Sequence, residues 1–347
     1  MMLQKGFSIV ELMIAITLSL LLGIGIFQVF TSNQESARLT QALVEVQDTG
    51  RLSLDLIARD IRNAGYWGCA GGLDRVNSTV DTGGTDYDAD IHGIGAAGTG
   101  GGVSALDDVA AGTDVYGVAV VEGTDVLQLR SMSSDGISIA QAMPTVSAAM
   151  FVSDNNDFAQ GDVIAVSDCQ SADVFQITNV NTAGGADNLV HNTGNTVNPG
   201  NSTGSLSRQY GIGSQILRPT FRSYFLNEQA GVRRLMFRNE QNVTTVFADN
   251  VEDFQLMFGV DSTGDGVADI FVSGTTIDNE IAGAGTYDYD DVLTIEVRLR
   301  VASSLTDVVD EGIVYAWNGN AALPAGVDEG RLRREFSSVS TVRSRIP

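Results

Sequence analysis

One long apolar stretch near the start of the chain restricts its fold more than any other feature. Residues 7–30, FSIVELMIAITLSLLLGIGIFQVF, carry a single charge at Glu11, and residues 12–27 carry none. As an α-helix, these 24 residues would extend roughly 36 Å, which is enough to cross the hydrocarbon core of a bilayer. The stretch therefore predicts one transmembrane helix at residues 7–30.

The residues around the start of this stretch distinguish between kinds of N-terminal segment. A secretory signal peptide has its cleavage site after the apolar run, and no A-x-A-like site follows residue 30. A plain membrane anchor is a second interpretation. The sequence KGFSIVEL at residues 5–12 closely resembles the class III signal of type IV pilins and type II secretion pseudopilins. This resemblance implies that a prepilin peptidase removes the leader 1–6 by cutting between Gly6 and Phe7, and methylates the new amine of Phe7.

The acid in the apolar run has a physical explanation of its own. A carboxylate in lipid costs several kcal/mol unless it is paired or close to the interface. Cleavage would create a cation at Phe7, which shares a helix face with Glu11 because the two residues are four apart. The pair could close within one chain or across to a neighbour. The resemblance implies the second arrangement, in which Glu11 captures the amine of an adjacent subunit and sets the axial register of a fibre.

A helical pattern continues beyond the apolar run but becomes amphipathic. Apolar residues recur at spacings of three and four, and polar residues fill the other face; the apolar set is Leu39, Ala42, Leu43, Val46, Leu54, Ile57, Ala58 and Ile61. Gly50 interrupts the pattern, and Asn63-Ala64-Gly65 predicts the end of the helix. We therefore predict a helix over residues 7–64, about 87 Å long. A helical linker in any anchored protein is the alternative to a pilin spine.

A second resemblance lies at the end of this predicted helix. Residues 60–69, DIRNAGYWGC, resemble the DIR-x-AGYxGC pattern of PilW-type minor pilins, and weaker echoes occur near residues 250–301. The resemblance implies a type IV pilin-like fold of class α+β, with residues 65–347 forming a large head in the periplasm.

The head sequence predicts mostly antiparallel β-structure. Residues 292–301 alternate apolar and polar side chains, which is typical of a strand with one wet face. Further short strands are expected at residues 126–129, 162–166, 174–178, 221–226, 234–238 and 251–260. Residues 98–103 and 182–204, rich in Gly, Thr and Asn, are expected to be loops.

The chain contains two cysteines, Cys69 and Cys169. In an oxidising periplasm two thiols tend to pair, so we expect a disulfide that ties the helix exit to the β head. Two free buried thiols are the alternative.

One segment of the head has the pattern of a metal-binding loop. Residues 261–269, DSTGDGVAD, resemble the calcium loop D-x-[DN]-x-D-G. The predicted ligands are Asp261, Thr263, Asp265, Val267 and Asp269. The segment departs from the EF-hand at Thr263 and lacks the Glu at position twelve. An ordinary Asp/Gly turn is the other interpretation.

Charge and composition exclude several functions. With 20 Lys and Arg against 43 Asp and Glu, the formal net charge is −23, which argues against a general nucleic-acid binder. His92 and His191 have no nucleophile or acid in local register, so no enzymatic activity is expected.

The resemblances imply a minor pilin at or near the pilus tip, which joins other minor and major pilins through the N-terminal helix and offers its head to a tip adhesin. They also imply contact with the prepilin peptidase and the inner-membrane assembly platform. The protein would span the inner membrane once, with the head in the periplasm, and then enter the extracellular pilus. A type II secretion pseudopilin is the alternative.

Overall fold

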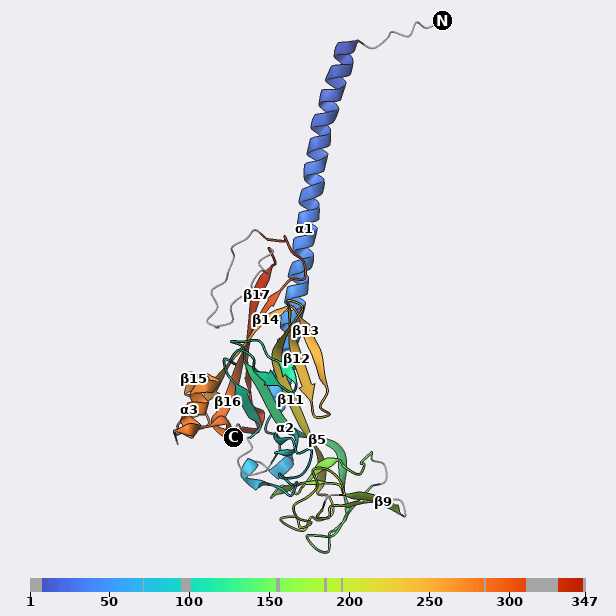
Figure 1. The fold of residues 1–347 in the computed structure, drawn as a ribbon, viewed down its shortest axis with the longest axis vertical. Coiled ribbons are helices and arrows are strands. Elements are labelled where there is room, and N and C mark those ends of the chain that lie inside the picture. Colours follow the sequence, from blue (N-terminus) through green and yellow to red (C-terminus); the bar gives the residue numbers. More distant parts are fainter. Residues whose placement is uncertain are drawn as a thin grey trace.

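The chain begins as a single long helix, α1 (Ile9–Asn63), which projects far beyond the rest of the molecule (Figure 1). The structure is a computed structural model and describes residues 8–70, 72–94, 101–153, 157–183, 186–194, 196–283, 285–309 and 330–345. Ser8 precedes the helix in an extended conformation. Ala64 follows it with a ψ of 142°, which ends the helical path, and Gly65 comes next with a φ of 69°. The bounds agree with the predicted helix within two residues.

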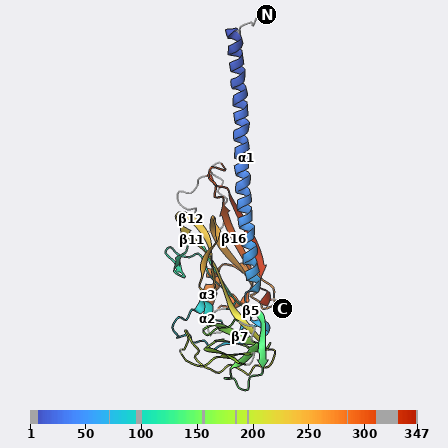
Figure 2. The same ribbon diagram turned by 90° about the vertical axis from the view of Figure 1, so that its right-hand side faces the viewer.

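The two halves of α1 have different surroundings. Residues 8–30 are exposed, and the segment is long and apolar enough to span a membrane. The second half buries a stripe of side chains against the head: Ala42, Val46, Gly50, Ser53, Leu54, Ile57, Ala58 and Ile61. The head therefore covers only the amphipathic part that the sequence predicts, as both views show (Figures 1 and 2).

Gly50 does not interrupt α1, contrary to the sequence-based expectation. The helix continues through this residue, and the ring of Phe336 packs where a Cβ would lie, 2.4 Å from the phenylalanine Cδ2. The glycine thus allows a close approach of strand β17 (Arg333–Thr341) to the helix.

The larger sheet has eleven strands. Its main order is β1-β8-β7-β11-β5-β6-β10-β9, with β2 on β5, and β12 and β13 continuing from β11. Of these pairs only β1–β8 is parallel. The strands are β1 (Val76–Ser78), β2 (Val103–Leu106), β5 (Val126–Gln141), β6 (Met150–Ser153), β7 (Val163–Ser167), β8 (Ala172–Gln176), β9 (Asn179–Ala183), β10 (Ala186–Val190), β11 (Gln215–Gln229), β12 (Val232–Asn239) and β13 (Thr244–Asp249).

The smaller sheet has four antiparallel strands in the order β15-β14-β16-β17, formed by β15 (Ile270–Val272), β14 (Val251–Val260), β16 (Val292–Ala302) and β17. The predicted alternation holds in β16 as far as Leu299, since Ile295 and Val297 are buried while Thr294 and Glu296 are half-buried. It fails at Arg300, which was expected on the wet face but is buried beside Glu252 and Asp253 of β14. The remaining elements are short: α2 (Ala89–His92), α3 (Gly274–Ala282), the β3–β4 ladder (Asp114–Val115 and Val118–Ala119) and the 3-10 turns η1 (Gly68–Ala70), η2 (Leu73–Arg75), η3 (Tyr289–Asp291) and η4 (Arg343–Arg345).

The main hydrophobic core joins α1 to both sheets. Leu54, Ile57 and Ile61 of the helix belong to one cluster with Tyr224 of β11 in the larger sheet and with Phe254 of β14 in the smaller sheet. Two further apolar clusters lie in the part of the head that is far from the N-terminus. The result is the α+β, pilin-like layout of a long helix with a large, mostly antiparallel β head.

Two segments that were predicted to be loops are partly ordered in the sheet. Gly102 and Val103 are buried at the start of β2, because Gly102 lies against the helix exit, where its Cβ would be 2.1 Å from the Gly65 nitrogen. Within residues 182–204, β10 pairs with both β6 and β9. The loop prediction is wrong at these positions, because long-range pairing orders sequences that have little apolar periodicity of their own.

Candidate assembly interface

The first half of α1 forms an exposed apolar surface. Ile9, Leu22 and Phe27 are 78%, 68% and 67% exposed, and no described part of the head covers them. Side chains of this kind avoid water, so this surface requires lipid or other apolar helices around it.

Glu11 is the one charged residue in this surface and lies in the first turn of α1. Its Oε2 accepts a hydrogen bond of 3.4 Å from the backbone N–H of Ser8, so the carboxylate turns back towards the N-terminal end of the helix. Gly6 and Phe7, the predicted processing residues, lie outside the described residues, as does Lys5. The described geometry places the Glu11 carboxylate at the helix end where cleavage would create an amine.

A line of small residues follows Glu11 along one side of the helix. Ala15, Ser19 and Gly23 recur every four residues and line a shallow groove with Phe27. The hydroxyl of Ser19 donates to the carbonyl of Ala15 at 2.8 Å, so it is satisfied within the helix. Small side chains at this spacing let apolar helices approach one another closely.

The helix exit is fixed to the large sheet by backbone hydrogen bonds. The N–H of Gly65 donates to the carbonyl of Arg130 at 2.8 Å, and the N–H of Met132 donates to the carbonyl of Tyr66 at 2.8 Å. Trp67 follows and is only 3% exposed. The glycines, aromatics and small residues of the sequence AGYWGC therefore form a tight turn that joins α1 to β5.

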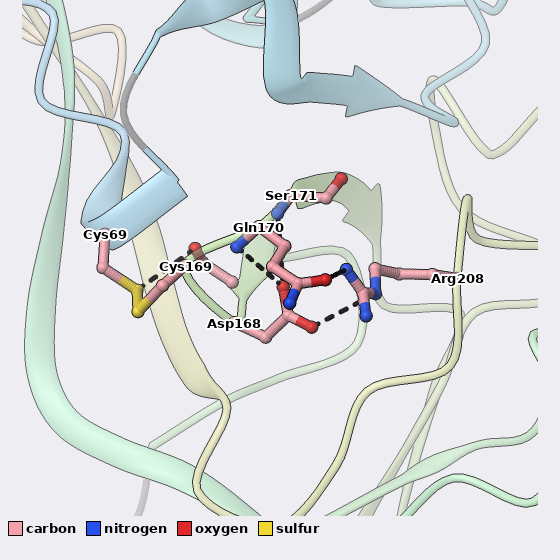
Figure 3. The surroundings of a disulfide bond; sticks show 7 residues. Cys69, Asp168, Cys169, Gln170, Ser171 and Arg208 are labelled. Carbon is pink, nitrogen blue, oxygen red and sulfur yellow. Dashed lines mark hydrogen bonds and ion pairs between the residues drawn. A yellow bond between two sulfur atoms is a disulfide. The ribbon is translucent and has the colours of Figure 1, made fainter.

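The expected disulfide between Cys69 and Cys169 is present, with the two Cα atoms 4.3 Å apart (Figure 3). It links η1 to the turn between β7 and β8. Asp168 supports this turn, since its Oδ1 accepts the N–H groups of Gln170 and Ser171 at 3.1 and 3.2 Å. Arg208 also contacts the turn, with its Nε 3.1 Å from Asp168 Oδ2 and its Nη1 donating to Gln170 Oε1 at 2.6 Å (Figure 3).

The segment with a calcium-like pattern forms a tight turn after β14. The carboxylate of Asp261 accepts four backbone N–H groups, from Thr263, Gly264, Asp265 and Gly266, at 2.6 to 3.2 Å. These bonds, the one from Gly266 first, hold the pKa of Asp261 below its usual value.

The other carboxylates of this turn also bond locally. Asp265 accepts from the N–H of Val267 at 2.9 Å, and Asp269 accepts from the N–H and hydroxyl of Ser262 at 2.9 and 3.0 Å. Across the described residues, no group of three or more His, Cys, Asp or Glu side chains could hold a metal ion. Calcium binding by this loop, through Thr263 and the carboxylates, remains a prediction.

Three contacts near the end of α1 could not be found from local sequence. The hydroxyl of Tyr224 on β11 donates to Asp60 Oδ2 at 2.7 Å, and burial together with the Asp60 charge raises the pKa of this tyrosine. Phe336 fills the space beside Gly50, and the hydroxyl of Ser344 donates to the carbonyl of Ala64 at 2.8 Å. All three partners of the helix come from the second half of the chain.

Part of this second half matches a known protein family. Residues 223–344 match the family model described as Type IV Pilus-assembly protein W, PilW. The match supports a PilW-type type IV pilus-assembly protein. No curated protein and no solved structure matches the chain.

In the structure, the segment that matches PilW contacts the helix whose sequence carries the N-terminal features. The PilW-matching segment begins in β11 and contains β12 to β17, so it includes the whole smaller sheet. Tyr224, Phe336 and Ser344 all lie within it. The segment that carries the PilW match is thus one part of the head that holds the helix end with the sequence DIRNAG, beside β5, whose Arg130 carbonyl accepts from Gly65.

Proposed function

We propose that this chain is a minor pilin of the type IV pilus that lies at or near the tip, initiates assembly with other minor pilins and offers its head to a tip adhesin. The observation that carries the proposal is the contrast within α1. Its first half is bare, apolar and has one acid at the start, while its second half is fixed to a PilW-matching head.

The exposed first half of α1 supports a role in assembly because its apolar side chains can pack against other helices. In the inner membrane, lipid would cover it, and in a filament, the equivalent helices of other pilins would replace the lipid. The line of Ala15, Ser19 and Gly23 would allow close helix contact. Glu11 would bind the methylated amine of Phe7 in a neighbour, after the prepilin peptidase has removed residues 1–6 and the assembly platform has extracted the subunit.

The size of the head supports a position at the tip. The described part of residues 65–347 forms an eleven-stranded sheet, a four-stranded sheet and a two-stranded ladder beyond the helix, and a head of this volume would collide with its copies in a repeating shaft. A low copy number at the end of the fibre removes this conflict.

The test is the incorporation of a Glu11→Val variant into sheared pili, with Glu35→Val as the control, since Glu35 is also exposed on α1 but lies beyond the apolar run. We expect both variants to insert in the inner membrane. Glu11→Val should be depleted in pili by about tenfold or more, because even 1.4 kcal/mol of lost pairing has this effect. Normal incorporation of Glu11→Val would contradict the registry role. If deletion of the gene abolishes protein secretion but leaves pili intact, the chain would instead be assigned to the secretion pseudopilins.

A further inference from the structure

The part of the head formed by residues 261–291, here called the acidic lobe, has a surface unlike the rest of the molecule. It comprises the turn after β14, strand β15, helix α3 and η3. Strand β15 and α3 lie together at one side of the head (Figure 1).

The acidic lobe carries only negative charge. It contains no Lys, Arg or His, and its acids are Asp261, Asp265, Asp269, Asp278, Glu280, Asp288, Asp290 and Asp291. Elsewhere carboxylates commonly face arginines, as in Asp90 with Arg130 and Glu252 with Arg333. Within the described chain, the acids of the lobe other than Asp290 accept hydrogen bonds from neutral groups and form no ion pair. These seven acids therefore present negative charge that the described residues do not neutralise.

Exposed apolar side chains lie among the acidic residues of the lobe. Val267 is 61% exposed, and Ile270 and Phe271 of β15 are 40% and 48% exposed. Gly259 of β14 pairs with Phe271, and a Cβ at this glycine would lie 3.1 Å from the phenylalanine Cζ. The ring thus lies across the outer face of the sheet, where it remains accessible.

Strand β15 is also an open edge of the smaller sheet. Among the described strands it pairs only with β14. An exposed edge offers free backbone N–H and C=O groups to another strand, and proteins often block such edges with Lys or Pro. The sequence of β15, Ile-Phe-Val, contains neither. Because the strand is short, pairing with it alone would be weak, so apolar and charged contacts must contribute to any stable complex.

We propose that the acidic lobe binds a basic partner protein, which adds an extended segment to the free edge of β15. Apolar side chains of this segment would cover Ile270 and Phe271, and its Lys and Arg residues would face the surrounding carboxylates. Charge complementarity decides between partners: a second copy of this chain brings a net charge of −23 and an equally acidic lobe, so it would be repelled. The proposal concerns a surface remote from the apolar half of α1 and does not depend on the role of Glu11.

Photocrosslinking from β15 tests the proposal in cells that make the full chain. Phe271→p-benzoylphenylalanine places the reactive group at the edge, and Ile212→p-benzoylphenylalanine, at a residue that is 74% exposed outside the lobe, is the control. We expect ultraviolet light to give an adduct from position 271 but not from 212. Mass spectrometry should locate the link in a partner segment with net positive charge. An adduct with a second copy, an adduct with an acidic or neutral segment, or no adduct at 271 would overturn the proposal.

A charge variant tests the electrostatic part with the same readout. Asp265→Asn with Asp278→Asn removes two exposed charges from the lobe, and Asp114→Asn with Glu122→Gln removes two exposed charges elsewhere. We expect the first pair to lower the adduct yield about tenfold, equivalent to about 1.4 kcal/mol, and the second to leave it unchanged. Equal yields from both pairs would refute the role of charge. Normal incorporation of the variants into pili would show that the substitutions leave assembly through α1 intact.

Discussion

Removal of the disulfide should destabilise the head without changing its contacts. Cys69 and Cys169 are 100 residues apart in the sequence, and in the chain-entropy model a loop of about 100 residues restricts the unfolded chain by about 4.7 kcal/mol at 25 °C. The backbone bonds from Gly65 to Arg130 and from Met132 to Tyr66 do not involve the sulfurs. The fold should therefore persist in Cys69→Ser/Cys169→Ser, with a free energy of unfolding lower by about 3–5 kcal/mol.

Trp67 provides a local probe for this measurement. It is buried two residues from Cys69, and the second tryptophan, Trp317, lies outside the described residues, so Trp317→Phe leaves one fluorescent reporter. Urea unfolding of the full chain in a non-ionic detergent should show a midpoint lower by about 1 M or more in the double variant. Reduction of the parent protein should give a similar shift. A change below about 0.5 kcal/mol, within the range of an ordinary surface substitution, would refute the reasoning. So would two free thiols in the denatured, unreduced protein.

Three further predictions concern the head. Gly50→Ala should cost about 1–3 kcal/mol because Phe336 occupies the position of the new methyl group, whereas Gly25→Ala, which meets no atom within 4 Å, should leave the thermal unfolding of the head unchanged; equal melting temperatures would contradict the packing. Burial raises the pKa of Asp125 to about 8 from 3.8, so protonation favours the folded state. The free energy of unfolding should therefore fall as pH rises from about 4 to 8, by up to about 1.4 kcal/mol per unit; Asp125→Asn should remove this slope, and identical pH profiles would refute it. Millimolar Ca²⁺ should raise the melting temperature and slow the hydrogen exchange of residues 261–269 if they bind the ion, and no change would assign them to an ordinary turn.

Elements with strong local periodicity could be predicted from the sequence. The apolar spacing of α1 located the helix within two residues, and the predicted strand 251–260 coincides with β14 (Val251–Val260). The disulfide was predicted from two cysteines and an expected oxidising compartment. In each case the signal lies in neighbouring residues or in the chemistry of the residue type itself.

Elements that depend on distant partners could not be predicted. Gly50 looked like an interruption of the helix because the phenylalanine that packs beside it is 286 positions away at Phe336. Strand β10, Ala-Asp-Asn-Leu-Val, is short and lacks apolar alternation, and it is ordered by pairing with β6 and β9. The bond between Asp60 and Tyr224 likewise gives no local signal, although it explains why an acid stands near the end of the helix.

The mass of the mature protein, isolated intact from membranes and from sheared pili, tests most directly whether α1 is a processed pilin helix. Our account predicts a chain that starts at Phe7 and carries one additional methyl group on its N-terminal amine. A mass that retains residues 1–6, or an unmodified N-terminus at any residue other than Phe7, would contradict it.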